Sequence, residues 1–237
     1  MPTLPSAFDK SEIVVEKRLR PKDAATLVLV RRDHDTPRIL MGQRHGNMAF
    51  MANKYVFPGG RVDAADQRLT AGGHLRPHVE ARLTKNATLA LARGLALAAI
   101  RETFEETGVL LGERSKNPLC TRATAWRNFF AHGVAPRLDQ LEFIARAVTP
   151  TNRLRRFDAR FFMADASAIA HQLDAAQNDE LLAPCWLSFP EARAVDLPSI
   201  TRAVLDEAEA RLLDGPDGAR PVPYYRFRHG RTVREFL

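Results

Sequence analysis

The stretch Arg101–Val109 (RETFEETGV) decides how the rest of this 237-residue sequence is interpreted. It ends a run from about Thr88 to Glu106 that is rich in Ala, Leu, Arg and Glu, the residues that most favour a helix. Gly108 follows where a glycine commonly closes a helix, because glycine adopts the left-handed conformation without strain. The sequence therefore predicts a helix whose last turns carry this stretch.

Three glutamates of the stretch are related by i, i+3 and i+4, so their side chains share one helix face: Glu102, Glu105 and Glu106. Like charges at this spacing repel by about 0.2–0.5 kcal/mol per pair, and the negative end of the helix dipole adds to the penalty. A solvated acidic face is the structural alternative, and such faces are common on exposed helices. A stretch that breaks two local rules without visible compensation is, however, typical of a functional site.

Upstream, residues 57–60 (FPGG) have the pattern of a turn at the end of a strand, and Asp66 follows six positions after Gly60. Together these residues resemble the signature of the Nudix hydrolases, G-x5-E-x7-R-E-U-x-E-E-x-G-U, in which U is a bulky apolar residue. Arg101–Val109 matches the second half at all but one specified position, the exception being Thr103. The resemblance implies a mixed β-sheet sandwiched between α-helices, and hydrolysis of a diphosphate linkage.

The spacing between the two halves of the signature departs from the family pattern. Asp66 and Arg101 are 35 positions apart (101 − 66), where the signature has 8, so about 27 extra residues interrupt the motif. We place the insertion at about residues 67–93, because residues 68–87 carry loop signals such as Gly72, Gly73 and Pro77 and little strand character. Asp66 stands where the family has glutamate. Neither its role nor that of the insertion follows from the sequence.

The resemblance also implies a metal site. Mg²⁺, for which Mn²⁺ can substitute, prefers hard oxygen ligands, few of them from protein. Glu105, Glu106 and the Gly60 carbonyl are the expected ligands. Glu102 is expected to share the metal or to take the proton of the attacking water.

Two further residues complete the expected catalytic set. Arg101 would bridge and orient the glutamates, although a plain helix salt bridge is the alternative. The family often draws another catalytic acid from a late loop, and Glu180 is the candidate there, with Asp179 as an equal neighbour.

Substrate contacts are suggested by a resemblance to the coenzyme A diphosphatase-like branch. That branch has an arginine thirteen positions before the Phe of FPGG, and Arg44 and Phe57 hold these two places. Ala49 and Asn53, however, stand where its motif expects Arg and Gly. The expected substrate is a nucleoside diphosphate derivative, with coenzyme A or an acyl-CoA as the first candidate.

Strands and helices interleave around the signature without a regular βα repeat. Short apolar or β-branched runs predict strands at residues 24–30, 38–42, 55–57, 160–164 and 185–188. Helices are expected at residues 121–133 and 199–213, the second with Ser199 as N-cap, whereas residues 139–146 suit a short helix or a strand. These elements predict an α/β or α+β fold in one domain, residues 23–237, after an N-terminal arm, residues 1–22.

Composition narrows the remaining function classes. The formal net charge is +7 with a pI near 9.9, yet the basic residues are scattered, so a nucleic-acid-binding protein is a weaker alternative. A non-catalytic Nudix module that senses a nucleotide is another, although it would be expected to have lost metal-site glutamates. Two cysteines, no secretory leader and no membrane-length apolar run favour a cytoplasmic protein with a small-molecule diphosphate partner. A homodimer stays open.

Overall fold

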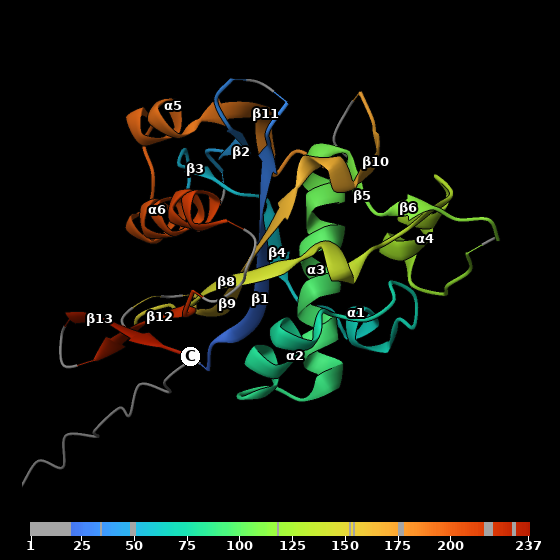
Figure 1. The fold of residues 1–237 in the computed structure, drawn as a ribbon, viewed down its shortest axis with the longest axis horizontal. Helices are drawn as coiled ribbons and strands as arrows, with labels where there is room; N and C mark the ends of the chain where they lie inside the picture. The colour runs from blue at the N-terminus through green and yellow to red at the C-terminus, as the bar shows by residue number, and fades with distance from the viewer. Residues whose placement is uncertain are drawn as a thin grey trace, which may run out of the picture.

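A large mixed β-sheet forms the centre of the computed structural model, which describes residues 20–33, 35–47, 51–117, 119–151, 153, 155–174, 178–215, 220–228 and 231–237 (Figure 1). Within these residues the sheet contains nine strands: β1 (Lys22–Arg31), β2 (Arg38–Arg44), β3 (Tyr55–Val56), β4 (Gly59–Arg61), β8 (Glu142–Val148), β9 (Phe157–Asp165), β11 (Leu181–Ser188), β12 (Pro223–Arg228) and β13 (Arg231–Phe236). Seven of them follow the order β11-β2-β1-β9-β8-β12-β13, while β3 pairs with β2 and β4 pairs with β1.

The sheet mixes both strand directions, as the sequence predicts. The pairs β1–β9 and β8–β12 are parallel. The other neighbours are antiparallel. Two short two-stranded sheets lie outside it: β5 (Val109–Leu111) with β10 (Ile169–Gln172), and β6 (Glu113–Arg114) with β7 (Val134–Ala135).

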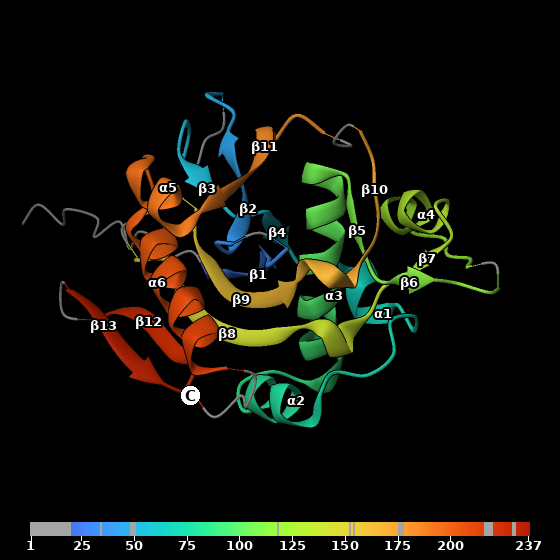
Figure 2. The same ribbon diagram turned by 45° about the horizontal axis from the view of Figure 1, so that its top comes forward.

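Helices cover both faces of the large sheet (Figure 2). One face carries α1 (Ala64–Arg68), α2 (Pro77–Thr84), α3 (Leu89–Thr107) and α4 (Thr124–Phe130), and the other carries α5 (Phe189–Ala194) and α6 (Ser199–Asp214). The three shorter helices of the first face each pack against α3. This order of helix, sheet and helix confirms the predicted fold class.

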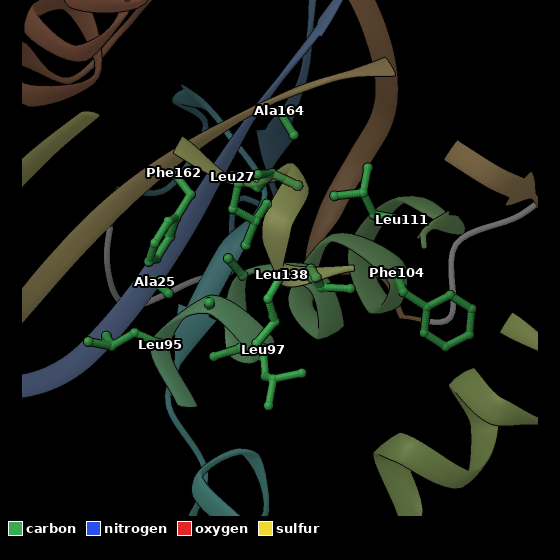
Figure 3. Packing of buried hydrophobic residues seen from close by; sticks show 14 of the residues in the cluster. Ala25, Leu27, Leu95, Leu97, Phe104, Leu111, Leu138, Phe162 and Ala164 are labelled. Carbon is green, nitrogen blue, oxygen red and sulfur yellow. The ribbon is translucent and has the colours of Figure 1, made fainter. Parts of the chain in front are cut away.

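Strand β1 is buried on both faces, as its apolar run predicts. Its side chains alternate, so that Ala25, Leu27 and Leu29 belong to the core cluster under α3, whereas Val28 and Val30 belong to the cluster under α6. Figure 3 shows the first of these clusters, in which Ala25 and Leu27 share the space beneath the helix with residues of α3 and β9. The sheet thus separates two hydrophobic cores.

Helix α3 runs through the first core, and its sequence explains both of its ends. The Thr88 side chain caps the first turn by accepting the N–H of Leu91, and Gly108 ends the helix with a left-handed φ of 73°. Thr103, the departure from the Nudix signature, is fully buried, and its hydroxyl is satisfied there because it donates to the Ala99 carbonyl at 2.7 Å. The helix predicted around the acidic stretch is therefore present, and it is anchored in the core.

The structure corrects the sequence prediction in several elements. Residues 68–87, expected to be loop, contain α2, which begins at Pro77 because proline fits the first turn of a helix. Pro198 precedes α6 in the cap position, so the expectation that Ser199 is the N-cap is wrong. Residues 139–146 divide between a 3₁₀ turn (Leu138–Gln140) and β8. The hairpin of β12 and β13 is not predicted at all.

Most of the expected N-terminal arm, residues 1–19, lies outside the described residues, and so does Ala49. Lys22, the last residue of that arm, instead begins β1. No helix in the described part of the chain combines the length and the apolar character that a bilayer crossing needs.

Candidate active site

The FPGG glycines face the acidic end of α3 where β4 pairs with β1. Gly59 lies opposite Thr26 and Gly60 lies opposite Ala25. A Cβ added to Gly59 would lie 2.5 Å from the Ala25 carbonyl oxygen, and one added to Gly60 would lie 2.5 Å from the carboxylate of Glu102. Glycine at these two positions therefore lets the backbone of β4 approach both its neighbouring strand and the helix.

Arg101 is 4% exposed, and its guanidinium divides between two sets of acids. Nη1 donates to Glu102 at 2.9 Å and to Glu105 at 3.2 Å. Nε and Nη2 each donate to Asp66 at 3.0 Å, and Nη2 also donates to the Arg61 carbonyl at 2.9 Å. A planar guanidinium suits this geometry because its donors point in several fixed directions at once.

Glu106 is the most deeply buried of the three glutamates, at 1% exposure. Its Oε2 accepts the Gly59 N–H at 2.8 Å, whereas Oε1 is buried and has no hydrogen-bond partner among the described residues. Burial, reinforced by the charge of Glu102, raises the pKa of Glu106 well above its ordinary value. Burial also raises the pKa of Glu102 to about 7 and raises the pKa of Glu105.

The loop before β11 is fastened to the end of α3 and carries Glu180. The N–H of Asn178 donates to the Glu105 carbonyl at 3.1 Å, and the Asn178 side chain accepts the N–H of Glu180 at 3.0 Å. The half-exposed carboxylate of Glu180 lies 3.7 Å from Nη2 of Arg44, the last residue of β2. Two segments far apart in the sequence thus meet beside the helix.

The charges of Glu180 and Arg44 reach the glutamates of α3. Burial is the main cause of the raised pKa of Glu102 and Glu106, and the negative charge of Glu180 raises both further. Arg44 acts on the pKa of Glu106 in the opposite direction. Asp179 and Glu180 are both exposed, and it is the pairing of Glu180 with Arg44 that distinguishes the two candidate acids.

Comparisons with known proteins bear on the fold, and no family model matches the sequence. The crystal structure of a Nudix hydrolase from Alicyclobacillus acidocaldarius matches this one with a TM-score of 0.63 and 27% sequence identity, over 81% of this chain and 92% of that one. The fold is that of a Nudix hydrolase. In sequence, a Caenorhabditis elegans protein that carries the name nudix hydrolase 7 is 30% identical over 152 residues.

The extent of these matches differs. The C. elegans alignment covers 60% of this chain but 43% of the relative, so the chain spans less than half the length of the curated protein it matches. The NUDIX domain of Shewanella oneidensis NrtR, solved with ADP-ribose, shares 13% identity at a TM-score of 0.48, over 82% of this chain and 90% of that one. That likeness adds nothing to the assignment, which depends on the Alicyclobacillus structure, the C. elegans sequence and the signature residues.

The residues around Glu106 could hold a divalent cation only together with oxygens from water or substrate. Among the described residues, no group of three or more His, Cys, Asp or Glu side chains is arranged to hold an ion alone. Arg101 holds the carboxylates of Glu102 and Glu105, which limits how far they converge. Mg²⁺, however, commonly takes one or two carboxylates and completes its octahedron with water and phosphate oxygens. The partnerless Oε1 of Glu106, next to the β4 glycines, fits such a site.

Phe57, a candidate substrate contact, lies away from the Nudix glutamates. Its side chain is 3% exposed and belongs to the core cluster under α6, together with Val28, Ile144 and Leu205. An enclosed ring has no face free for a substrate, so the structure does not support the expected contact. Phe57 instead fixes the start of the FPGG turn in the second core.

Asp66 is fully buried and supports Arg101 rather than a metal. Its Oδ1 accepts the indole N–H of Trp126 at 2.8 Å as well as Nε of Arg101, and its Oδ2 accepts the N–H of Asp63 at 2.8 Å as well as Nη2 of Arg101. Sequence reasoning missed Trp126, because no periodicity connects residues 60 positions apart and a lone tryptophan is usually a core residue.

Proposed function

We propose that this protein is a Mg²⁺-dependent diphosphatase that hydrolyses a nucleoside diphosphate derivative, with Mn²⁺ able to replace Mg²⁺. The excess of carboxylate at the end of α3 carries the proposal, because Arg101 alone bridges Asp66, Glu102 and Glu105, while Glu106 keeps one buried oxygen without a partner. The similarity to Nudix hydrolases supports diphosphate hydrolysis in general.

The residues are assigned from the chemistry of the reaction. A diphosphate resists attack because its oxygens are negatively charged, and a bound divalent cation would neutralise that charge and acidify a water molecule. Glu105, Glu106 and the Gly60 carbonyl are proposed to hold the ion. Glu102 would share this task or accept the proton of the attacking water, since burial raises its pKa to about 7, a suitable value for a base near neutral pH.

Two further residues have proposed roles around this centre. Arg101 would keep Glu102 and Glu105 in place through its two hydrogen bonds. Glu180 is the second candidate base, because its loop is fastened to the end of α3 by the hydrogen bond from Asn178. Water would attack one phosphorus of the linkage, and both products would end in a phosphate.

Arg44 is the proposed contact for a substrate phosphate. Its side chain is 14% exposed, and its buried Nε has no hydrogen-bond partner among the described residues. A guanidinium with an unused donor, next to the carboxylate centre, suits a phosphate group because its fixed N–H donors can bond two oxygens of the tetrahedral phosphate and the charges are opposite. A coenzyme A-like molecule is the first candidate, by the resemblance of the Arg44 position to the coenzyme A diphosphatase-like branch.

A panel of diphosphate compounds tests this function. The full chain is incubated with coenzyme A, an acyl-CoA, ADP-ribose and a dinucleoside polyphosphate, in Mg²⁺, in Mn²⁺ or in EDTA, and products are identified by mass spectrometry. Two phosphate-terminated products are expected in either metal and none in EDTA. Turnover in ¹⁸O-labelled water marks which phosphorus is attacked.

Each alternative gives a different result in the same panel. Fast turnover of ADP-ribose or of the dinucleoside compound, with none of coenzyme A, would remove the coenzyme A assignment. Binding without turnover would support a nucleotide sensor instead. Undiminished turnover in EDTA would contradict the metal site.

A further inference from the structure

Helix α4 lies against the signature helix although it belongs to a different part of the chain. Its Trp126 and Phe129 are fully buried, with ring centroids 5.2 Å apart, and Phe129 meets Phe104 of α3 edge to face at 5.4 Å. Edge-to-face aromatic pairs fix the relative orientation of the groups that they join. These contacts hold the Trp126 ring at one position beside α3.

Packing does not account for the polar edge of the Trp126 ring. The indole N–H is a donor only, and it points at Oδ1 of Asp66, 2.8 Å away, where both residues are 0% exposed. A phenylalanine would fill most of the same space without needing an acceptor. The indole N–H is therefore accounted for by its hydrogen bond to the Asp66 carboxylate.

Four donors fix the Asp66 carboxylate, and Trp126 supplies the one that comes from outside the signature region. Arg101 supplies two, the backbone N–H of Asp63 supplies the third, and the indole supplies the fourth. Two carboxylate oxygens have about four lone-pair sites, so this set is complete. Removing one donor leaves a buried lone pair unsatisfied and lets the carboxylate tilt.

Any tilt of Asp66 passes to Arg101, because Asp66 holds both Nε and Nη2 of that guanidinium. The remaining nitrogen, Nη1, holds Glu102 and Glu105. A continuous chain of hydrogen bonds thus runs from the indole, through one buried carboxylate and one buried guanidinium, to two glutamates of the proposed metal centre.

We propose that Trp126 is a positioning residue for this centre, acting on Glu102 and Glu105 through Asp66 and Arg101. The proposal rests on the proposed function, since it assigns those glutamates to catalysis. Trp126 touches no reacting group itself. Its effect is on how well the carboxylates are placed, which concerns the binding of the cation and the chemical step more than the binding of substrate.

The hydrogen bond is tested first, without any activity measurement. The chain has two tryptophans, so a Trp186→Phe variant leaves the indole N–H of Trp126 as a single signal in a ¹⁵N-correlated NMR spectrum. We expect this proton to exchange with D₂O at least about tenfold more slowly than an exposed indole, as a buried bonded N–H should. In Asp66→Asn its shift should move and its exchange should accelerate. An unchanged signal in Asp66→Asn would overturn the proposal.

The kinetic test compares Trp126→Phe with Trp186→Phe, the same substitution on β11. Trp126→Phe should lower kcat about tenfold, the lower limit for a hydrogen bond to a charged group. It should also raise the Mg²⁺ concentration for half-maximal activity and change KM by less than about twofold, whereas Trp186→Phe should leave all three unchanged. A drop in kcat that Trp186→Phe reproduces, or a change confined to KM, would overturn the proposal.

A double-mutant cycle separates positioning from general loosening of the fold. If Trp126 acts through Asp66, then Trp126→Phe should lower kcat by less than about twofold in an Asp66→Asn background. Independent effects that multiply would contradict it. Should Trp126→Phe not fold, the Trp186→Phe variant can be produced in cells supplied with benzothienylalanine in place of tryptophan. At position 126 this analogue replaces the indole N–H by sulfur within a ring of the same shape, and the tenfold loss of kcat is expected again.

Failure of this inference can be told from failure of the proposed function. If the wild-type protein hydrolyses no diphosphate, the function is wrong, and the NMR result still decides whether the indole holds Asp66. If the wild-type protein is active and Trp126→Phe equals it, the function stands and the positioning role is wrong.

Discussion

Glu142 and Glu106 are both buried on the α3 side of the sheet, yet they are partnered in opposite ways. Glu142, at the start of β8, receives Arg76 at 2.7 Å, His78 at 2.8 Å and Arg82 at 3.5 Å. Glu106 receives one backbone N–H, and its second oxygen has no partner within the described chain. The charge of Glu142 is thus more than balanced by two arginines, whereas Glu106 has no ion pair among the described residues.

This difference separates a structural charge cluster from the proposed functional one within a single molecule. Glu207, on the opposite side of the sheet, follows the structural pattern with three arginines: Arg211, Arg220 and Arg234. A buried carboxylate that only supports the fold is stable when its own chain supplies the opposite charge. In the α3 cluster one arginine, Arg101, pairs with Asp66, Glu102 and Glu105, whereas Glu106 has no ion pair among the described residues, as is expected if a divalent ion supplies the missing charge.

The largest expected effect tests the cation-poor side of the comparison. Glu106→Gln should lower kcat for the best diphosphate substrate by about 100-fold or more, because an oxygen proposed to hold the ion loses its charge. The melting temperature in EDTA should stay the same or rise, since a buried charge is removed. Steady-state kinetics and a thermal melt measure both. Activity within about tenfold of wild type would mean that Glu106 is not a ligand.

The matched substitution in the cation-rich cluster, Glu142→Gln, should reduce stability and leave activity nearly unchanged. Glu142→Gln should lower the free energy of unfolding by about 2–3 kcal/mol, because Arg76 and Arg82 keep their charges and lose their partner. Below the melting transition, kcat should stay within about twofold of wild type. Chemical denaturation and the same kinetic assay measure the two quantities. Normal stability with reduced activity would reverse the proposed distinction.

Lowering the pH in EDTA should stabilise the metal-free protein through Glu102. Burial raises the pKa of Glu102 to about 7 in the folded state, whereas the unfolded state keeps the ordinary value near 4.5. Between these values the folded state binds more protons, so the free energy of unfolding falls as the pH rises, by on the order of 1–2 kcal/mol between about pH 5.5 and pH 8. Urea unfolding across this range measures the slope, and Glu102→Gln should reduce it, while the raised pKa values of Glu105 and Glu106 keep part of it. A slope that is unchanged in the variant would contradict the contribution of Glu102.

The smallest effect is expected at an exposed cluster. Arg193 bonds Asp206 at 2.9 Å and also pairs with Glu209 on the surface of α6. Arg193→Ala should change the free energy of unfolding by less than about 1 kcal/mol, because water and salt screen exposed ion pairs. Denaturation in low and high salt measures it. A loss of more than about 1 kcal/mol would show that an exposed ion-pair cluster contributes more to the free energy of unfolding than solvent screening allows.

Local patterns in the sequence predict the helix of the candidate site and the strand beneath it. The helix with Glu102, Glu105 and Glu106 is predictable because its composition, its capping glycine and its spacing all lie within one short stretch. The buried strand β1 is predictable for the same reason, since an apolar run of strand length is a local signal.

What the sequence does not predict depends on contacts between distant segments or on residues with two structural meanings. Trp126 and Asp66 are 60 positions apart, and no periodicity joins them. Pro77 is taken for a loop signal although proline also begins helices, and it begins α2. The hairpin of β12 and β13 is rich in arginine and aromatic residues and mostly exposed or half-buried, so no continuous apolar run indicates it. Phe57 matches a position of the family motif, but its side chain packs in the core on the α6 side of the sheet, away from the face that carries α3.

The segment of chain between Asp66 and Arg101 offers a position at which the protein can be engineered. Helix α3 begins at Leu89, and a rise of about 1.5 Å per residue places that end about 18 Å from Arg101. The turn at Lys85 and Asn86 just before it is exposed. A reporter or a second module fused into this turn would therefore project away from the carboxylates, and lengthening a surface connection costs little entropy. This turn is therefore a suitable place to insert additional residues without disturbing the carboxylates of the candidate site.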